Sequence, residues 1–170
     1  MELLLWFYRI QIAHIRIIWN QGCSSVVNGA LTEIYGSKYK HTDEYLCLRS
    51  FPQDITDAVE RKGKYTEYRK DMISETGISV FMFGNKRDVA DPKKIIDSDG
   101  CWEEFTISRD SGSIIIPIGS TGYVAMKVLK EVKANIRSYP YLKDHIDVLE
   151  TETDADTLVA EVLKIIDECK

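Results

Sequence analysis

The chain has 170 residues, enough for a single domain, and its hydrophobic and charged fractions of 44% and 29% are those of an ordinary soluble globular protein. Its net charge of −5, without a basic stripe, argues against general nucleic-acid binding. The four cysteines lie far apart and form no CxxC pair. This pattern argues against a metal site and a disulfide scaffold, and it predicts reduced thiols in a cytoplasmic protein.

Apolar residues dominate the start of the chain. Four ionisable residues interrupt this run, namely Glu2, Arg9, His14 and Arg16. A membrane span needs about 20 residues with almost no charge, and a signal peptide begins with a positively charged region. Neither pattern fits, so we expect no membrane association. We expect residues 1–14 to form a segment of uncertain structure and residues 15–170 to form a single domain.

Runs of apolar residues predict about five short strands, at 15–18, 45–48, 78–83, 113–118 and 146–149. Helical spacing between these runs predicts helices over 27–36, 55–62, 65–76, 102–111 and 124–136, and a final helix that Thr153 or Asp154 caps. Gly77 and Gly112 are placed to end two of these helices. Strands that alternate with helices predict an α/β fold with a doubly wound parallel sheet and helices on both faces.

The central strand leads directly into Gly84-Asn85-Lys86, and a helix with two early glutamates follows. Ligands of open α/β sheets bind beyond the carboxyl ends of the strands. Lys86, Glu103 and Glu104 are therefore the first candidates for a ligand site. The alternative for the glutamates is a purely electrostatic role, because the first turn of a helix favours carboxylates.

Two turns that link a strand to a helix are rich in glycine and serine. They are Gly22-Cys23-Ser24-Ser25 and Gly119-Ser120-Thr121-Gly122. The exposed N–H groups of such turns bind phosphate, although capping by Ser24 or Ser25 is the simpler explanation of the first.

Arg69 lies on or beside the apolar face of the helix expected over 65–76. It either meets an anion or covers the core edge with its aliphatic stem. Phe83, Trp102 and Tyr123 lie near the predicted turns. Each either stacks on a nucleobase or packs into the core, and core packing is the favoured alternative.

Five segments carry a family resemblance: GCSSVVNGALTEIY (22–35), LRSFPQ (48–53), YRKDMISETGISVFMFGNK (68–86), WEEF (102–105) and IIIPIGSTGYVA (114–125). Taken in this order, they resemble the SLOG superfamily, a Rossmann-like group that includes the LOG-type nucleotide hydrolases. More narrowly, they resemble its sirtuin- and TIR-associated SLOG domain. That domain is known as the C-terminal sensor of Thoeris-type antiphage effectors. There it binds a cyclic ADP-ribose isomer made by a TIR-domain protein and activates an attached NAD-degrading domain.

The resemblance implies a receptor without catalytic residues, cofactor or metal, which forms homo-oligomers and binds neither nucleic acid nor membranes. It assigns ligand binding to Arg69, to Lys86 and to either Glu103 or Glu104. The pyrophosphate of such a ligand favours further contacts at the turns. The residues expected there are Gly22, Cys23, Ser24, Ser25, Gly84, Asn85, Gly119 and Ser120.

Two features depart from the family pattern. Trp19-Asn20-Gln21 stands where the family has further glycines, and a bulky side chain there bears on how closely a phosphate approaches. The sequence also shows no NAD-degrading domain, so the chain is either a fragment of an effector or a sensor that acts in trans.

Two other functions stay open. A LOG-type nucleotide N-glycosidase, or phosphoribohydrolase, uses a PGGxGT loop. The equivalent stretch here keeps a glutamate but lacks those glycines, which removes most of the positioning that hydrolysis needs. A structural oligomerisation module would instead use Arg69, Lys86 and the glutamates as an internal salt-bridge network.

Overall fold

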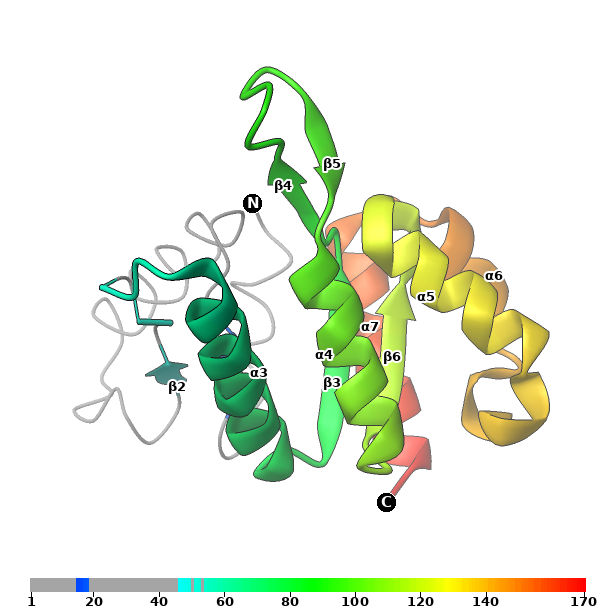
Figure 1. Cartoon of the computed structure of the whole chain (residues 1–170). Coiled ribbons are helices and arrows are strands. Elements are labelled where there is room, and N and C mark those ends of the chain that lie inside the picture. Colours follow the sequence, from blue (N-terminus) through cyan, green and yellow to red (C-terminus); the bar gives the residue numbers. More distant parts are fainter. Residues whose placement is uncertain (1–14, 19–45, 50, 53) are drawn as a thin grey trace, which may run out of the picture. The chain divides into compact units, whose positions relative to one another are not determined.

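A computed structural model describes residues 15–18, 46–49, 51–52 and 54–170 (Figure 1). The chain divides into two compact units, Met1–Thr76 and Gly77–Lys170. Each unit is described by itself. The expected turn at Gly22–Ser25, the expected helix over 27–36 and Trp19-Asn20-Gln21 lie outside the described residues.

In its described residues, the first unit contains a parallel strand pair and one long helix. Strand β1 (Ile15–Ile18) pairs with β2 (Leu46–Arg49), from Ile15 opposite Leu46 to Ile18 opposite Arg49. Both strands lie close to where the apolar runs predict them. Helix α3 (Ala58–Ser74) begins after Asp57, whose carboxylate accepts hydrogen bonds from the amides of Val59 and Glu60 at 3.0 and 2.8 Å.

Helix α3 corrects the prediction of two helices over 55–62 and 65–76. It continues through Gly63, where an added Cβ would meet nothing within 4 Å. An interior glycine costs about 1 kcal/mol relative to alanine, which a helix of this length absorbs. The helix ends with Glu75 at its C-cap, so Gly77 lies beyond the position expected to terminate it.

The second unit is built on a buried parallel pair. Strand β3 (Ile78–Met82) pairs with β6 (Ile114–Ile118), from Ile78 opposite Ile114 to Met82 opposite Ile118. Helices α4 (Asp99–Asp110) and α5 (Tyr123–Ala134) both contact the two strands. Figure 1 shows α4 in front of this pair and α7 (Ala155–Glu168) behind it.

The core of this unit follows the predicted helical periodicity. Val124, Val128 and Val132 of α5 are at most 1% exposed, and α7 buries Leu158, Val162, Ile165 and Ile166. Asp154 caps α7 by accepting a hydrogen bond from the amide of Thr157 at 2.9 Å. Three short 3-10 helices complete the unit: η3 (Gly119–Thr121), η4 (Ile136–Ser138) and η5 (Pro140–Leu142).

The strand predicted at 146–149 is wrong, because helix α6 (Ile146–Thr151) occupies these positions. Its two buried residues, Ile146 and Leu149, are three positions apart. That spacing places them on one face of a helix but on opposite faces of a strand. A four-residue apolar run is too short for periodicity to separate these cases.

The stretch between β3 and α4 contains an antiparallel hairpin. Strand β4 (Asn85–Arg87) pairs with β5 (Ile95–Asp97), and the hairpin projects beyond the start of α4 (Figure 1). Asp88 and Asp91 shape the turn by accepting hydrogen bonds from the amides of Ala90 and Lys93 at 2.9 and 3.1 Å. Such aspartate turns replace backbone pairing between short strands.

The fold is therefore α/β with a small parallel sheet in each unit. Across the described part of the chain the parallel strands form two pairs, so the predicted sheet of about five strands is not confirmed. Within the same residues, no helix is long and apolar enough to cross a membrane.

A candidate ligand site at the carboxyl ends of β3 and β6

Strands β3 and β6 end side by side, with Met82 opposite Ile118. The backbone that follows β3 is bonded to the turn after β6: the amide of Phe83 donates to Oγ1 of Thr121 at 2.7 Å, and the amide of Ala125 donates to the Phe83 carbonyl at 3.0 Å. The structure thus brings two predicted stretches, Gly84–Lys86 and Gly119–Ser120, to one edge of the sheet. We call this region the β3–β6 edge.

Two helices begin at the β3–β6 edge. The amide of Ser98, the N-cap of α4, donates to the carbonyl of Gly84 at 2.8 Å, and Ser98 Oγ accepts from the amide of Cys101. Helix α5 begins after Gly122 without a side-chain cap. The N-terminal ends of both helices carry partial positive charge, which favours an anion, and in the first turn of α5 the amide of Ala125 is used by the Phe83 carbonyl.

Gly84 and Gly119 act as packing positions at this edge. A Cβ on Gly84 would lie 2.6 Å from Cβ of Val124 and 2.8 Å from Sγ of Cys101, and one on Gly119 would lie 2.4 Å from Cδ2 of Leu129. The absent side chains let α4 and α5 approach the strand ends. Both were predicted as ligand contacts, and the structure shows that the Cβ direction of each faces protein atoms.

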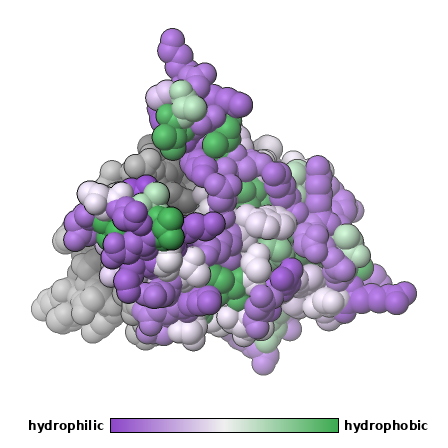
Figure 2. Space-filling view, in the orientation of Figure 1, coloured by the Kyte–Doolittle hydropathy of each residue, from purple (hydrophilic) through white to green (hydrophobic). Residues whose placement is uncertain are grey.

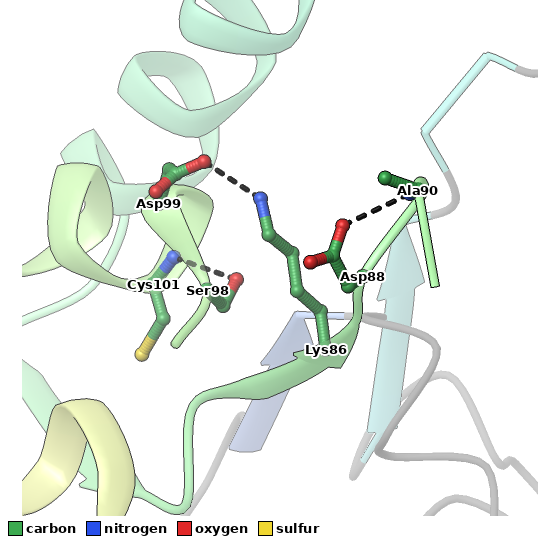
Figure 3. A network of polar contacts seen from close by, with 6 residues as sticks. All are labelled: Lys86, Asp88, Ala90, Ser98, Asp99 and Cys101. Carbon is green, nitrogen blue, oxygen red and sulfur yellow. Dashed lines mark hydrogen bonds and ion pairs between the residues drawn. The ribbon is translucent and has the colours of Figure 1, made fainter. Parts of the chain in front are cut away.

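Lys86 supplies a cation at the start of α4. Its ammonium lies 2.6 Å from the carboxylate of Asp99, the first residue of that helix (Figure 3). The Asp99 side chain is 91% exposed and the Lys86 side chain 35%. An exposed ion pair contributes about 0–1 kcal/mol, so this contact leaves the lysine available to a stronger anion. Lys86 is thus paired with Asp99, which was not among the residues of the predicted salt-bridge network.

Glu103 and Glu104 lie in the second turn of α4, not in its first turn as predicted. The helix begins earlier than expected because Ser98 caps it, and Asp99 is the acidic residue of its first turn. Glu104 is only 8% exposed, on the same face as the buried Phe105, whereas Glu103 is half-buried. Both have interaction partners.

Arg69 belongs to the first unit and lies on α3. It is 8% exposed, and its guanidinium carbon lies 5.0 Å from the ring centre of Phe51 and 5.9 Å from that of Tyr65. Tyr65 is fixed in turn by donating a hydrogen bond to the carbonyl of Pro52 at 3.1 Å. The two rings orient the guanidinium by cation–π contacts, and Arg69 has a further interaction partner.

The two roles predicted for Arg69 were contact with an anion and coverage of the core edge, and neither included contact with aromatic rings. Tyr65, four positions earlier on the same helix, was a usable signal because residues four apart share a helix face. Phe51 gave none, since its approach to Arg69 depends on the tertiary fold.

Ser120 has an unsatisfied hydroxyl group at the β3–β6 edge. Its hydroxyl oxygen is buried and has no hydrogen-bond partner, the one such side-chain atom found among the described residues. A buried hydroxyl without a partner costs about 1–3 kcal/mol. Neighbouring Thr121, by contrast, donates to the carbonyl of Ile118 at 2.6 Å.

Replacing Ser120 with alanine is therefore expected to stabilise the protein by about 1 kcal/mol, because the unpaired hydroxyl is removed without loss of a bond. Urea unfolding of the wild type and the variant measures this difference. The matched control is Thr121→Val, which removes a hydroxyl that is bonded. It is expected to destabilise by a similar amount, and a stability loss in Ser120→Ala would contradict the assignment.

The fold and this edge define an α/β protein whose parallel strands end at glycine turns, two helix N-termini and a cation, the arrangement in which such sheets bind ligands. A family model matches residues 20–169, and the chain belongs to the Sir2- and TIR-associating SLOG family. The family expected from the sequence is thereby confirmed.

Three curated relatives share this region, and each carries the name NAD(+) hydrolase ThsA. The chain is 35% identical to the protein of Acinetobacter baumannii (strain 532279) over 84% of its own length and 32% of the relative. It is 33% identical to that of Cytobacillus dafuensis over 84% of the chain and 29% of the relative. For the protein of Bacillus cereus (strain MSX-D12), identity is 36% over 68% of the chain and 23% of the relative. The chain spans about a third of the first two relatives.

Proposed function

We propose that this chain is a non-catalytic receptor domain that binds a cyclic ADP-ribose-type signal nucleotide in Thoeris-like antiphage defence. In this proposal it regulates an NAD-degrading effector in the cytoplasm, works as a homo-oligomer, and receives a signal made by a TIR-domain protein. NAD hydrolysis would then belong to a fused or partner domain. Membership of the Sir2- and TIR-associating SLOG family and relatives named as NAD(+) hydrolases support this context.

The position of Lys86 is the observation that supports a ligand with phosphate groups. This lysine lies by the start of α4, where it forms an ion pair with the exposed Asp99. Phosphate groups favour a cation combined with backbone N–H donors at helix N-termini. In the proposed complex, a pyrophosphate replaces Asp99 as the partner of Lys86 and lies against the positive N-terminal end of α5, which has no side-chain cap.

The remaining candidates are assigned by their chemistry. In the first unit Arg69 is the candidate cation, with its guanidinium close to the rings of Phe51 and Tyr65. A ribose hydroxyl would donate to a carboxylate of α4, and the half-buried Glu103 suits this role better than the buried Glu104. Asn85 and the backbone near Gly119 and Ser120 would complete the polar contacts.

Lys86→Ala is expected to weaken binding of the cyclic ADP-ribose isomer by about 10-fold to 100-fold, since a hydrogen bond to a charged group contributes about 1.5–3 kcal/mol. Its stability should fall by less than about 1 kcal/mol, because the pair with Asp99 is exposed. The matched control is Lys133→Ala, which breaks a 2.6 Å pair with Glu150 in the same unit. It should lose as little stability and keep ligand affinity.

A thermal-shift series with cyclic ADP-ribose isomers, ADP-ribose, NAD and AMP tests the function itself. A ligand at 100 times its dissociation constant stabilises a protein by about 2.7 kcal/mol, which moves the unfolding midpoint by several degrees. A shift confined to a cyclic isomer and lost in Lys86→Ala supports the receptor. Release of free base from AMP would establish a nucleotide hydrolase instead, and the absence of any shift would leave a structural module.

A further inference from the structure

The second unit has two non-glycine residues with a left-handed backbone, Phe83 with φ of 57° and Tyr123 with φ of 50°. They are also the only such residues in the whole described part of the chain. Each is next to a glycine with positive φ, Gly84 or Gly122. Bulky residues are disfavoured in this conformation, and such strain persists where the surroundings impose it, often at ligand sites.

Both strained residues are at the β3–β6 edge, on two backbone segments that hydrogen bonds join. Phe83 donates a hydrogen bond to Thr121 and accepts one from Ala125, and each of these residues is two positions away from Tyr123. The two aromatic residues therefore leave adjacent turns, one after β3 and one after η3. Their conformations are coupled, since the same hydrogen bonds fix both turns.

Their rings face outward, against the expectation of core packing. Phe83 is 43% exposed and Tyr123 is 44% exposed. In this unit the other exposed large apolar side chains are Val89 and Ile95, on the hairpin, and Trp102. Figure 2 shows hydrophobic residues on the projecting hairpin among hydrophilic neighbours. Trp102 is partly engaged by the ring of Phe105, 5.1 Å away. Phe83 and Tyr123 thus each have a strained backbone, an exposed ring and a position at the ends of the parallel strands.

We propose that Phe83 and Tyr123 are the base-stacking residues of the nucleotide site and that the strained turns hold their rings toward the ligand. This inference rests on the proposed function and extends it, because it assigns the purine ring to the β3–β6 edge and the pyrophosphate to Lys86 and the helix starts. Nucleobases stack on aromatic side chains through their π faces. The buried hydroxyl of Ser120, in the turn that precedes Tyr123, has no hydrogen-bond partner, and a polar edge of the ligand would satisfy it.

The test uses Phe83→Asn and Tyr123→Asn. Asparagine is enriched in the left-handed region, so each substitution removes the ring while relaxing the backbone. Both variants are expected to unfold at a temperature equal to or above that of the wild type. Their affinity for the cyclic ADP-ribose isomer should fall by about 10-fold or more, as for removal of an aromatic stacking partner of a base.

Three controls separate stacking from other roles. Tyr123→Phe keeps the ring and should keep the affinity. Val89→Asn removes an apolar side chain that is 96% exposed at the hairpin tip, and it should change neither affinity nor stability. Inorganic pyrophosphate, which has no base, should compete with the cyclic isomer equally well in the wild type and in both asparagine variants.

The outcomes distinguish this inference from the function on which it rests. If the wild type binds no cyclic isomer, the proposed function fails and the stacking assignment fails with it. If the wild type binds and the asparagine variants bind equally well, the stacking assignment alone is overturned. A lowered unfolding temperature in both variants would also overturn it, because the rings would then stabilise the fold.

Discussion

Replacing Gly84 with alanine is expected to destabilise the protein by about 2–5 kcal/mol. Two costs add: an alanine in the left-handed conformation costs about 1–2 kcal/mol, and overpacking costs about 1–3 kcal/mol. Gly84 has φ of 81°, and its Cβ would lie 2.6 Å from Cβ of Val124, an atom fixed close to the helix backbone. Urea unfolding followed by circular dichroism measures the loss.

Gly112→Ala is the matched control for this prediction. Gly112 follows α4 with φ of 74°, and an added Cβ would meet nothing within 4 Å. This variant carries only the conformational cost, about 1–2 kcal/mol. The difference between the two variants therefore measures the packing of α4 and α5 against the end of β3. Equal losses would show that Gly84 is required only for its backbone conformation.

The strand ends were the most predictable part of the site. The apolar run before Gly84 and the SIIIPI run before Gly119 are long enough to identify buried strands, and parallel pairing then places both turns at one edge. The packing function of Gly84 was not predictable, because it depends on Val124 and Cys101, which reach it only through the tertiary fold.

The errors have physical causes of the same kind. The start of α4 was placed too late because Ser98 directly follows a strand in an acidic stretch. Its capping bond to Cys101 produces no pattern of apolar residues that would mark the start of a helix. The exposure of Phe83 and Tyr123 was missed because aromatic residues beside buried strands usually pack inside. Positive φ angles at such residues cannot be inferred from composition.

His145 is expected to stabilise the second unit in a pH-dependent way. Its side chain is 2% exposed, with Nδ1 lying 2.5 Å from a carboxylate oxygen of Glu161 and Nε2 3.0 Å from one of Glu168, both on α7. A neutral imidazole has one N–H, so only the protonated ring donates to both carboxylates. Burial lowers the pKa of His145, but the hydrogen bonds from the ring to the two glutamates outweigh burial and raise the pKa above the usual 6.5.

The sign of the effect follows from this raised pKa. The folded state binds the proton more tightly than the unfolded state, so the stabilisation is fully present below about pH 6.5 and is lost as pH rises through the folded-state pKa. His145→Gln is expected to lose about 2 kcal/mol at pH 5.5, the contribution of hydrogen bonds to charged groups, and clearly less at pH 8.5. Urea unfolding of both proteins at the two pH values measures the change.

Comparison with the variant isolates the contribution of His145 from that of the rest of the chain. The difference in stability between wild type and His145→Gln cancels every contribution that the two proteins share. Glu168→Gln, at a carboxylate that is 48% exposed, removes one of the two charges and should reduce the pH dependence without abolishing it. A stability difference that is the same at both pH values would mean that His145 has the same pKa in the folded and the unfolded protein. The contact between α6 and α7 would then depend on packing alone.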